Sequence, residues 1–379
     1  MTLRGYFDVM DYGAKGDGAT NDLAALQSAV DAADAAGGGT IWLGPGAFNI
    51  GNGTWKIGKA NAQHFVNVEG INLNATKIVC DTSGGNAAIY LNIEKYVSVR
   101  RFSVINQGAR GGFGIQMGGD DGTGTQSTGN QFEHLLLQNF HHGIDVTGGV
   151  GTSSETTFNH CVFQLNDYGF YDANFNATDF LFILPEMYNN GVGLFISTSN
   201  VTVFGGAANS NGTDFYIAGG FDATVKIVAV RSELCTGTWL VALANNYLSI
   251  EDCIIEPRAL GVEVINATAE LYVRNTQLKG FITWNGSQQS AITLDHVWVH
   301  TPNTDWSIGN QYSHATPPYG PGFRMTNNTG AQPNARAHIR DVYEGWNNTF
   351  YPDIDGSLAV RPSDNMRVVL VQLVADNTC

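Results

Sequence analysis

The chain has 379 residues, of which 46 are glycine and 43% are apolar, while only 14% carry a charge. This composition is typical of a large all-β body with many turns. The formal net charge of −15 argues against nucleic acid and against anionic membranes as partners, because both are bound through clusters of Lys and Arg.

The first clear pattern lies in residues 7–48, and it predicts a strand, a helix and a second strand. Phe7–Val9 and Thr40–Leu43 have the composition of strands. The helix is predicted over Asp22–Ala36 from apolar residues three or four positions apart, at Leu23, Leu26, Val30 and Ala33. We expect this amphipathic helix to cover the exposed strand edges at one end of a solenoid.

The same segment, FDVMDYGAKGDGATNDLAALQSAVDAADAAGGGTIWLGPGAF, resembles the N-terminal signature of the pectate-lyase-like right-handed β-helix superfamily. That group includes phage tailspike depolymerases, polygalacturonase-like hydrolases, pectate lyases and mannuronan epimerase modules. The resemblance implies the fold and leaves the reaction open, because function on such a fold depends on the individual site.

Two departures from the superfamily's motifs prevent a transfer of catalytic residues. The Asn-Thr-Asp, Asp-Asp and Gly-His-Gly set of the polygalacturonases is missing. The epimerase-like Tyr-Gly-Phe is present at residues 168–170, but Tyr171-Asp172-Ala173 replaces the Asp-Pro-His that should follow.

Residues 113–281 contain a repeated phrase of a small or polar residue, an apolar residue, an outward residue and usually a second apolar residue. The repeats start 19 to 29 residues apart, at Gly114, Gly143, Gly169, Gly193, Asp214, Thr238, Gly261 and Gly280. Units this short cannot bury their own apolar face and must stack as coils. Asparagines near the turns are expected to adopt the left-handed backbone of tight corners, at Asn139, Asn166, Asn190 and Asn211. The sequence therefore predicts an all-β, right-handed parallel β-helix.

We expect three parts along the chain: a cap with the helix over residues 1–60, the parallel β-helix over 61–300, and a C-terminal loop and β cap over 301–379. Residues 301–322 are rich in Pro, Gly and Asn, and the repeat stops before them. Met366–Val374 reads as one long β run that could cap the last coil or pair with another subunit.

The five cysteines are expected to be mostly free, because Cys161 and Cys253 lie several coils apart and a bridge needs Cα atoms within about 7 Å. An odd cysteine count and the absence of a secretory signal after Met1 favour synthesis in the cytosol. We expect the protein on a virion tail or outside the cell.

Glu233 and Glu256 form the principal candidate site, because each lies five residues before a repeat position. In register they would stack about 4.8 Å apart, and their repulsion would raise one pKa, giving the acid and base of a glycoside hydrolase. Arg231 and Arg258 flank the pair as substrate-binding residues. The alternative is a solvated or Arg-paired corner without catalysis.

A second candidate surface consists of the outward positions of the repeat. Tyr171, Phe195 and Tyr216 would form an aromatic strip that either stacks sugars or is buried in a homotrimer. Asp145 shares this outward column, and Tyr168 stands beside it as a further substrate-binding residue.

The sequence thus predicts a depolymerase of a bacterial or plant polysaccharide, with hydrolysis by the Glu pair as the first hypothesis. The first alternative is a uronic-acid lyase, for which His141, His142, His160, Tyr168 and Arg231 are available as base and carboxylate partner. The second is a non-catalytic, carbohydrate-binding virion attachment protein. No cofactor is expected, although Asp120-Asp121 in a polar loop could hold Ca²⁺.

Overall fold

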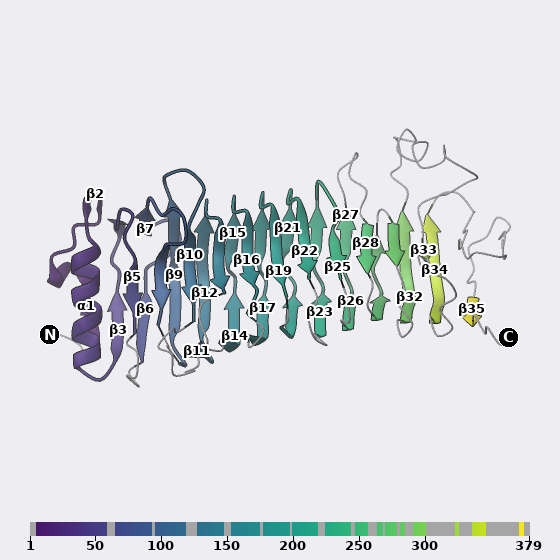
Figure 1. Ribbon diagram of the computed structural model, residues 1–379, viewed down its shortest axis with the longest axis horizontal. Helices are drawn as coiled ribbons and strands as arrows, with labels where there is room; N and C mark the ends of the chain where they lie inside the picture. The colour runs from purple at the N-terminus through teal and green to yellow at the C-terminus, as the bar shows by residue number, and fades with distance from the viewer. Residues whose placement is uncertain are drawn as a thin grey trace. The chain divides into compact units, whose positions relative to one another are not determined.

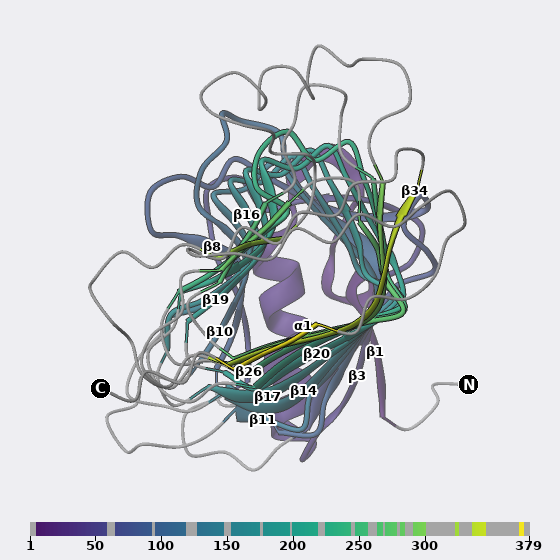
Figure 2. The ribbon, with the colours of Figure 1, turned by 90° about the vertical axis from the view of Figure 1, so that its right-hand side faces the viewer.

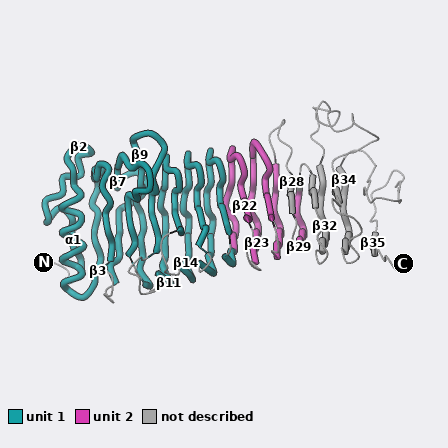
Figure 3. Tube along the Cα trace, viewed as in Figure 1, with its two compact units in different colours: residues 1–201 teal, residues 202–379 magenta. Residues whose placement is uncertain are grey.

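A computed structural model describes residues 5–58, 65–92, 95–118, 127–147, 153–174, 177–197, 199–218, 224–243, 247–256, 264–267, 270–278, 281–284, 291–300, 323–325, 336–345 and 371–374. The chain is an all-β parallel β-solenoid, and its described part holds one α-helix (Figure 1). The fold predicted from the sequence is therefore confirmed. Clustering of contacts divides the chain into unit 1, residues 1–201, and unit 2, residues 202–379 (Figure 3).

Unit 1 is built from two parallel sheets, which we call sheet A and sheet B. Sheet B contains β5 (Trp55–Ile57), β8 (Ala87–Leu91), β10 (Phe113–Met117), β13 (His142–Val146), β16 (Tyr168–Asp172) and β19 (Val192–Ile196). Sheet A contains β1 (Tyr6–Asp8), β2 (Asp17–Asn21), β3 (Gly39–Trp42), β4 (Gly46–Asn49), β6 (Val66–Glu69), β7 (Thr76–Cys80), β9 (Ser98–Asn106), β11 (Ser127–Thr128), β12 (Gln131–Gln138), β14 (Ser153–Asn159), β15 (Val162–Gln164), β17 (Thr178–Ile183) and β18 (Glu186–Tyr188).

Unit 2 repeats this construction, and β20 (Val201–Phe204) runs into it from unit 1. One sheet contains β22 (Thr213–Ile217), β25 (Leu240–Ala242), β28 (Val264–Ala267), β31 (Phe281–Trp284) and β33 (Phe323–Met325). The other contains β21 (Ala207–Asn209), β23 (Thr224–Val228), β24 (Arg231–Glu233), β26 (Tyr247–Glu251), β27 (Ile254–Glu256), β29 (Glu270–Arg274), β30 (Gln277–Leu278), β32 (Ala291–His300), β34 (Arg336–Gly345) and β35 (Val371–Val374). β35 pairs antiparallel with β34 and forms the described end of the predicted C-terminal β run.

The predicted helix is α1 (Leu23–Ala35), which follows the 3-10 helix η1 (Val9–Tyr12). Its buried face contacts η1 and the first strands of the unit, and this face consists of Leu26, Ala29, Val30, Ala33 and Asp34. Figure 2 shows α1 lying over the middle of the coils, within the first part of unit 1. In the described part of the chain, no helix has the length and apolar character needed to cross a membrane.

The glycines at the start of the repeats in unit 1 are required by the close approach of neighbouring coils. A Cβ on Gly143 would lie 2.5 Å from the carbonyl oxygen of Gly169, and the pairs Gly114–Gly143 and Gly169–Gly193 have the same distance. Real Cβ atoms do not approach an oxygen so closely, so a column of glycines lets the coils stack at strand spacing.

The asparagines near the turns only partly follow the prediction. Asn139 has the expected left-handed backbone with φ 68°, but the corresponding corners of the next coils are occupied by Leu165, Asn189 and Ser210. The prediction was wrong for Asn166, Asn190 and Asn211, which directly follow these corners and are buried.

The buried asparagines instead link successive coils through both ends of their amides. In unit 1, Asn166 Oδ1 accepts from the backbone N–H of Phe140 at 2.9 Å, and Asn166 Nδ2 donates to the Leu137 carbonyl at 3.0 Å. Asn190 Oδ1 accepts from Asn166 N at 3.0 Å, and Asn190 Nδ2 donates to the Phe163 carbonyl at 2.9 Å. The amide of Asn carries a donor and an acceptor on two separate atoms, so one short side chain can bond a backbone N–H and a backbone carbonyl at the same time.

The cysteine prediction is confirmed for the four cysteines that the structure describes, Cys80, Cys161, Cys235 and Cys253. All four are free and buried. Burial raises the pKa of the Cys161 and Cys253 thiols to about 12, so both behave as small apolar core residues.

Candidate functional site

Sheet B of unit 1 carries two rows of side chains that break its otherwise buried pattern. The strands β10, β13, β16 and β19 pair in register. The first and fourth residues of β10, β16 and β19 are half-buried, whereas the same positions of β13, His142 and Asp145, are buried. The first row consists of Phe113, His142, Tyr168 and Val192, and the second of Gln116, Asp145, Tyr171 and Phe195.

A buried His–Asp pair lies at the centre of these rows. His142 Nδ1 and Asp145 Oδ1 are 2.6 Å apart, and Asp145 is completely buried. The other carboxylate oxygen, Oδ2, accepts from Gln116 Nε2 at 3.1 Å and from Thr147 Oγ1 at 2.6 Å. Asp145 contacts His142 and is completely buried, and the direct substrate contact expected from the sequence stays a prediction.

Aromatic rings hold the His142 imidazole in place. It stacks on Phe113 at 4.9 Å and on Tyr171 at 4.0 Å between ring centroids, with interplanar angles of 18° and 16°. Tyr168 presents its ring edge-on to His142 at 5.3 Å. Packing and the Asp145 bond together fix both the position of the imidazole and its tautomer.

Tyr171 continues the aromatic surface toward the next coil. Its ring stacks on Phe195 at 4.6 Å, so two of the three positions in the expected aromatic strip are in contact. Burial, followed by the neighbouring Tyr168 and Asp145, raises the pKa of Tyr171 and keeps its phenol neutral. The third position, Tyr216, is a half-buried residue of β22 in unit 2.

A charged network borders the site on its exposed side. Asp167 lies 2.7 Å from His141 Nδ1 and 3.0 Å from Arg110 Nη1. Partial burial acts to raise the pKa of Asp167, but the hydrogen bonds from His141 and Arg110 outweigh it and hold this pKa below its usual range. His141 also stacks on His142 at 4.3 Å, so the network is directly attached to the central imidazole.

The glutamates singled out from the sequence lie in unit 2 and are brought together there. β24 and β27 pair with Glu233 opposite Glu256, which is the register that the repeat predicts. Arg231 contacts Glu233 directly, and its Nη2 lies 3.8 Å from Glu256 Oε2. This guanidinium offsets the repulsion of the two acids, which favours the Arg-paired corner over the hydrolase site. Arg258 lies outside the described residues.

The sequence marked His142 and Asp145 as candidate residues but did not predict their contact, because strict alternation along a strand places residues three apart on opposite faces. The usable signal was the repeat itself, since the same two positions of each coil carry the outward side chains. Among the described residues, no group of His, Cys, Asp and Glu is arranged to hold a metal ion, and Asp120-Asp121 lies outside them.

Comparison with known proteins supports the parallel β-solenoid fold described above. Residues 6–280 match the family model described as rhamnogalacturonase A/epimerase, pectate lyase-like. A segment of 47 residues is 55% identical to the mannuronan C5-epimerase AlgE3 of Azotobacter vinelandii, covering 12% of this chain and 3% of that protein. The curated relatives are thus matched over only a small part of their length.

Two solved structures are similar in fold at low sequence identity. The gp42 tailspike of Acinetobacter phage vb_AbaP_AS12 has a TM-score of 0.60 at 11% identity, covering 97% of this chain and 67% of the tailspike. The catalytic unit of a GH87 α-1,3-glucanase from Streptomyces thermodiastaticus has a TM-score of 0.55 at 12% identity, covering 91% and 69%.

Proposed function

Because the chain belongs to the rhamnogalacturonase A/epimerase, pectate-lyase-like family, we propose that it is a polysaccharide depolymerase with its active site on sheet B of unit 1. The observation that carries the proposal is the buried 2.6 Å bond between His142 and Asp145, set among stacked rings on the outer face. A base, its orienting carboxylate and two half-buried tyrosines meet there.

The chemistry that these groups support best is β-elimination in a uronic-acid polymer. With Asp145 accepting from Nδ1, the hydrogen of His142 sits on that nitrogen, and Nε2 is left as the acceptor. Nε2 takes the proton next to the sugar carboxylate, the electron pair forms a C=C bond, and the glycosidic C–O bond breaks. Tyr168 donates a proton to the leaving oxygen.

The test is activity on a panel of bacterial capsular and plant polysaccharides, followed by reducing ends and by the absorbance of unsaturated uronates. His142→Gln and Tyr168→Phe should each lower the rate at least about a hundredfold, the usual scale of general acid–base catalysis. His134→Gln is the matched control, because His134 is exposed in the same unit and contacts only the surface residue Glu133 among the charged groups that the structure describes. Full activity of His142→Gln would refute this site.

A second candidate is hydrolysis by Glu233 and Glu256, which their in-register placement supports. It predicts new reducing ends without unsaturated products, and a loss of activity in Glu233→Gln and Glu256→Gln while His142→Gln stays active. Binding without either product would instead indicate a non-catalytic attachment protein. In all three cases we propose a location on a virion tail or outside the cell.

A further inference from the structure

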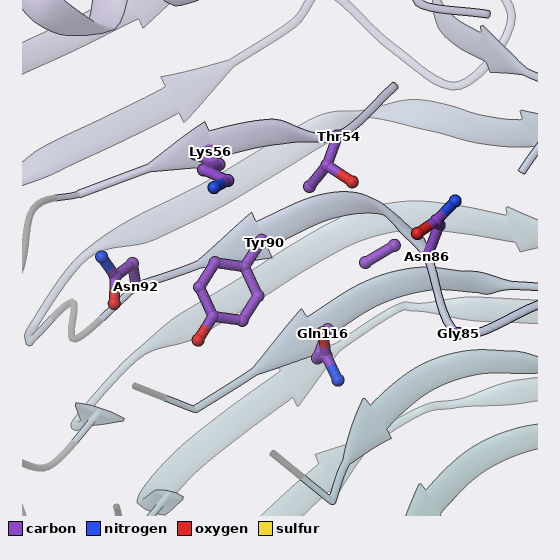
Figure 4. Close-up of a pocket in the computed structure, with 8 residues that line it drawn as sticks. Thr54, Lys56, Gly85, Asn86, Tyr90, Asn92 and Gln116 are labelled. Carbon is purple, nitrogen blue, oxygen red and sulfur yellow. The ribbon is translucent and has the colours of Figure 1, made fainter. Parts of the chain in front are cut away.

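We propose that a pocket beside the candidate site binds the anionic substituent, a carboxylate or a sulfate, of an acidic sugar in the polysaccharide. This inference rests on the proposed polysaccharide-binding role of sheet B and names the chemical class of the substrate. The pocket has a volume of ≈ 390 Å³ and lies on the N-terminal strands of unit 1 (Figure 4).

Three successive strands of sheet B build the pocket. β5, β8 and β10 pair so that Lys56 lies opposite Tyr90 and Tyr90 opposite Gln116. Figure 4 shows these three side chains on neighbouring strands, with Asn92 on one side and Thr54 and Asn86 on the other. The residues come from distant parts of the chain and share one face because the coils stack in register.

Lys56 is a cation without a counter-ion. Its side chain is exposed and forms no ion pair with any residue that the structure describes. The three arginines that the structure describes in unit 1 differ, because Arg100 and Arg101 bind Glu69 and Arg110 binds Asp167.

Two hydrogen bonds with α1 hold the backbone of Lys56 in place. Its N–H donates to Gln27 Oε1 of α1 at 3.2 Å, and its carbonyl accepts from Gln27 Nε2 at 3.1 Å. The ammonium group is therefore presented from an anchored strand.

The remaining lining groups suit a sugar ring. Thr54, Asn86, Asn92 and Gln116 offer hydroxyl and amide groups that can both donate to and accept from sugar hydroxyls. Tyr90 adds a half-buried ring on which an apolar sugar face can stack. The chain has a net charge of −15 and therefore repels an acidic polymer overall. An unpaired cation such as Lys56 offers such a polymer a local point of attraction.

The pocket is joined to the candidate site. Gln116 lines the pocket and also donates to Asp145 at 3.1 Å. Lys56 lies three strand spacings from Asp145, or about 14 Å. An acidic sugar held by Lys56 would therefore place the polymer along the row that leads to His142 and Tyr171.

The experiment measures binding by calorimetry, so it does not depend on cleavage. The ligands are an oligogalacturonate, a sulfated galactan oligosaccharide and the carboxyl-reduced, neutral form of the first. The wild type should prefer one of the two anionic ligands over the neutral one, and which one it prefers identifies the substituent.

Lys56→Gln should weaken binding of that ligand by at least about tenfold and leave neutral binding unchanged, since it removes one charge-assisted contact. Lys226→Gln, an exposed lysine of unit 2, is the control and should bind as the wild type does.

Unchanged anionic binding by Lys56→Gln, or equal wild-type affinity for all three ligands, would overturn the pocket assignment. If the binding depends on Lys56 but no polysaccharide is cleaved, the pocket stands and the depolymerase proposal fails. If cleavage depends on His142 while Lys56→Gln binds normally, the depolymerase stands and the pocket assignment fails.

Discussion

Asp214 is the buried acid whose replacement tests the electrostatics of this fold most directly. Its carboxyl group is fully buried in unit 2, where it accepts from Asn211 Nδ2 at 2.8 Å and from Ser232 Oγ. Burial raises the pKa of Asp214 from 3.8 to about 6, although the hydrogen bonds from Ser232 and Asn211 act in the opposite direction.

The sign and size of the effect follow from this pKa. The folded protein holds the proton more tightly than the unfolded chain, so the stabilisation from this group is complete below pH 3.8 and is lost as the pH rises through about 6. A shift of about two units corresponds to about 3 kcal/mol in the free energy of unfolding, of which roughly half is lost between pH 5 and pH 8.

Asp214→Asn removes the ionisation and keeps a side chain that can accept from one neighbour and donate to the other. Urea unfolding at pH 5 and pH 8 gives the free energy of unfolding of both proteins. Relative to the wild type, the free energy of unfolding of the variant should be higher at pH 8 than at pH 5 by on the order of 1 to 2 kcal/mol. Asp252→Asn is the control, because Asp252 is exposed in the same unit.

The reasoning is refuted if the free energies of unfolding of Asp214→Asn and the wild type differ by the same amount at pH 5 and at pH 8. The carboxyl group would then ionise equally well in the folded and unfolded states, and its burial would carry no charge penalty.

Three further predictions concern packing, thiols and assembly. Gly143→Ala should lower the free energy of unfolding by about 1–3 kcal/mol, because the added Cβ meets the Gly169 carbonyl, whereas Gly44→Ala, with nothing within 4 Å, should not. Titration of the unfolded, unreduced protein with a thiol reagent should find at least three thiols, and a single thiol would contradict the free cysteines. Light scattering should give the mass of a homotrimer, and a monomer well above micromolar concentration would count against it.

The repeat made the fold and part of the geometry predictable from the sequence. In a parallel solenoid each coil lies in register on the last, so equal positions in the repeat become neighbours in space. For this reason the placement of Glu233 beside Glu256, and of Tyr171 beside Phe195, followed from spacing alone. The helix over residues 22–36 was equally clear, because its apolar positions recur with helical period.

Only the tertiary structure shows which of these neighbouring residues are buried and which side chains they contact. The repeat could not show that Asp145 is fully buried behind His142, because both residues occupy positions that are half-buried in the neighbouring strands β10 and β16. Nor could it show that Arg231 reaches both glutamates, since the reach of a long side chain depends on its rotamer. The Lys56 pocket joins segments about thirty residues apart, and only the structure shows that this ammonium group has no acidic partner among the described residues, whereas Arg100, Arg101 and Arg110 each have one. Sequence spacing determines which residues become neighbours in a solenoid, whereas burial and side-chain direction determine their chemistry.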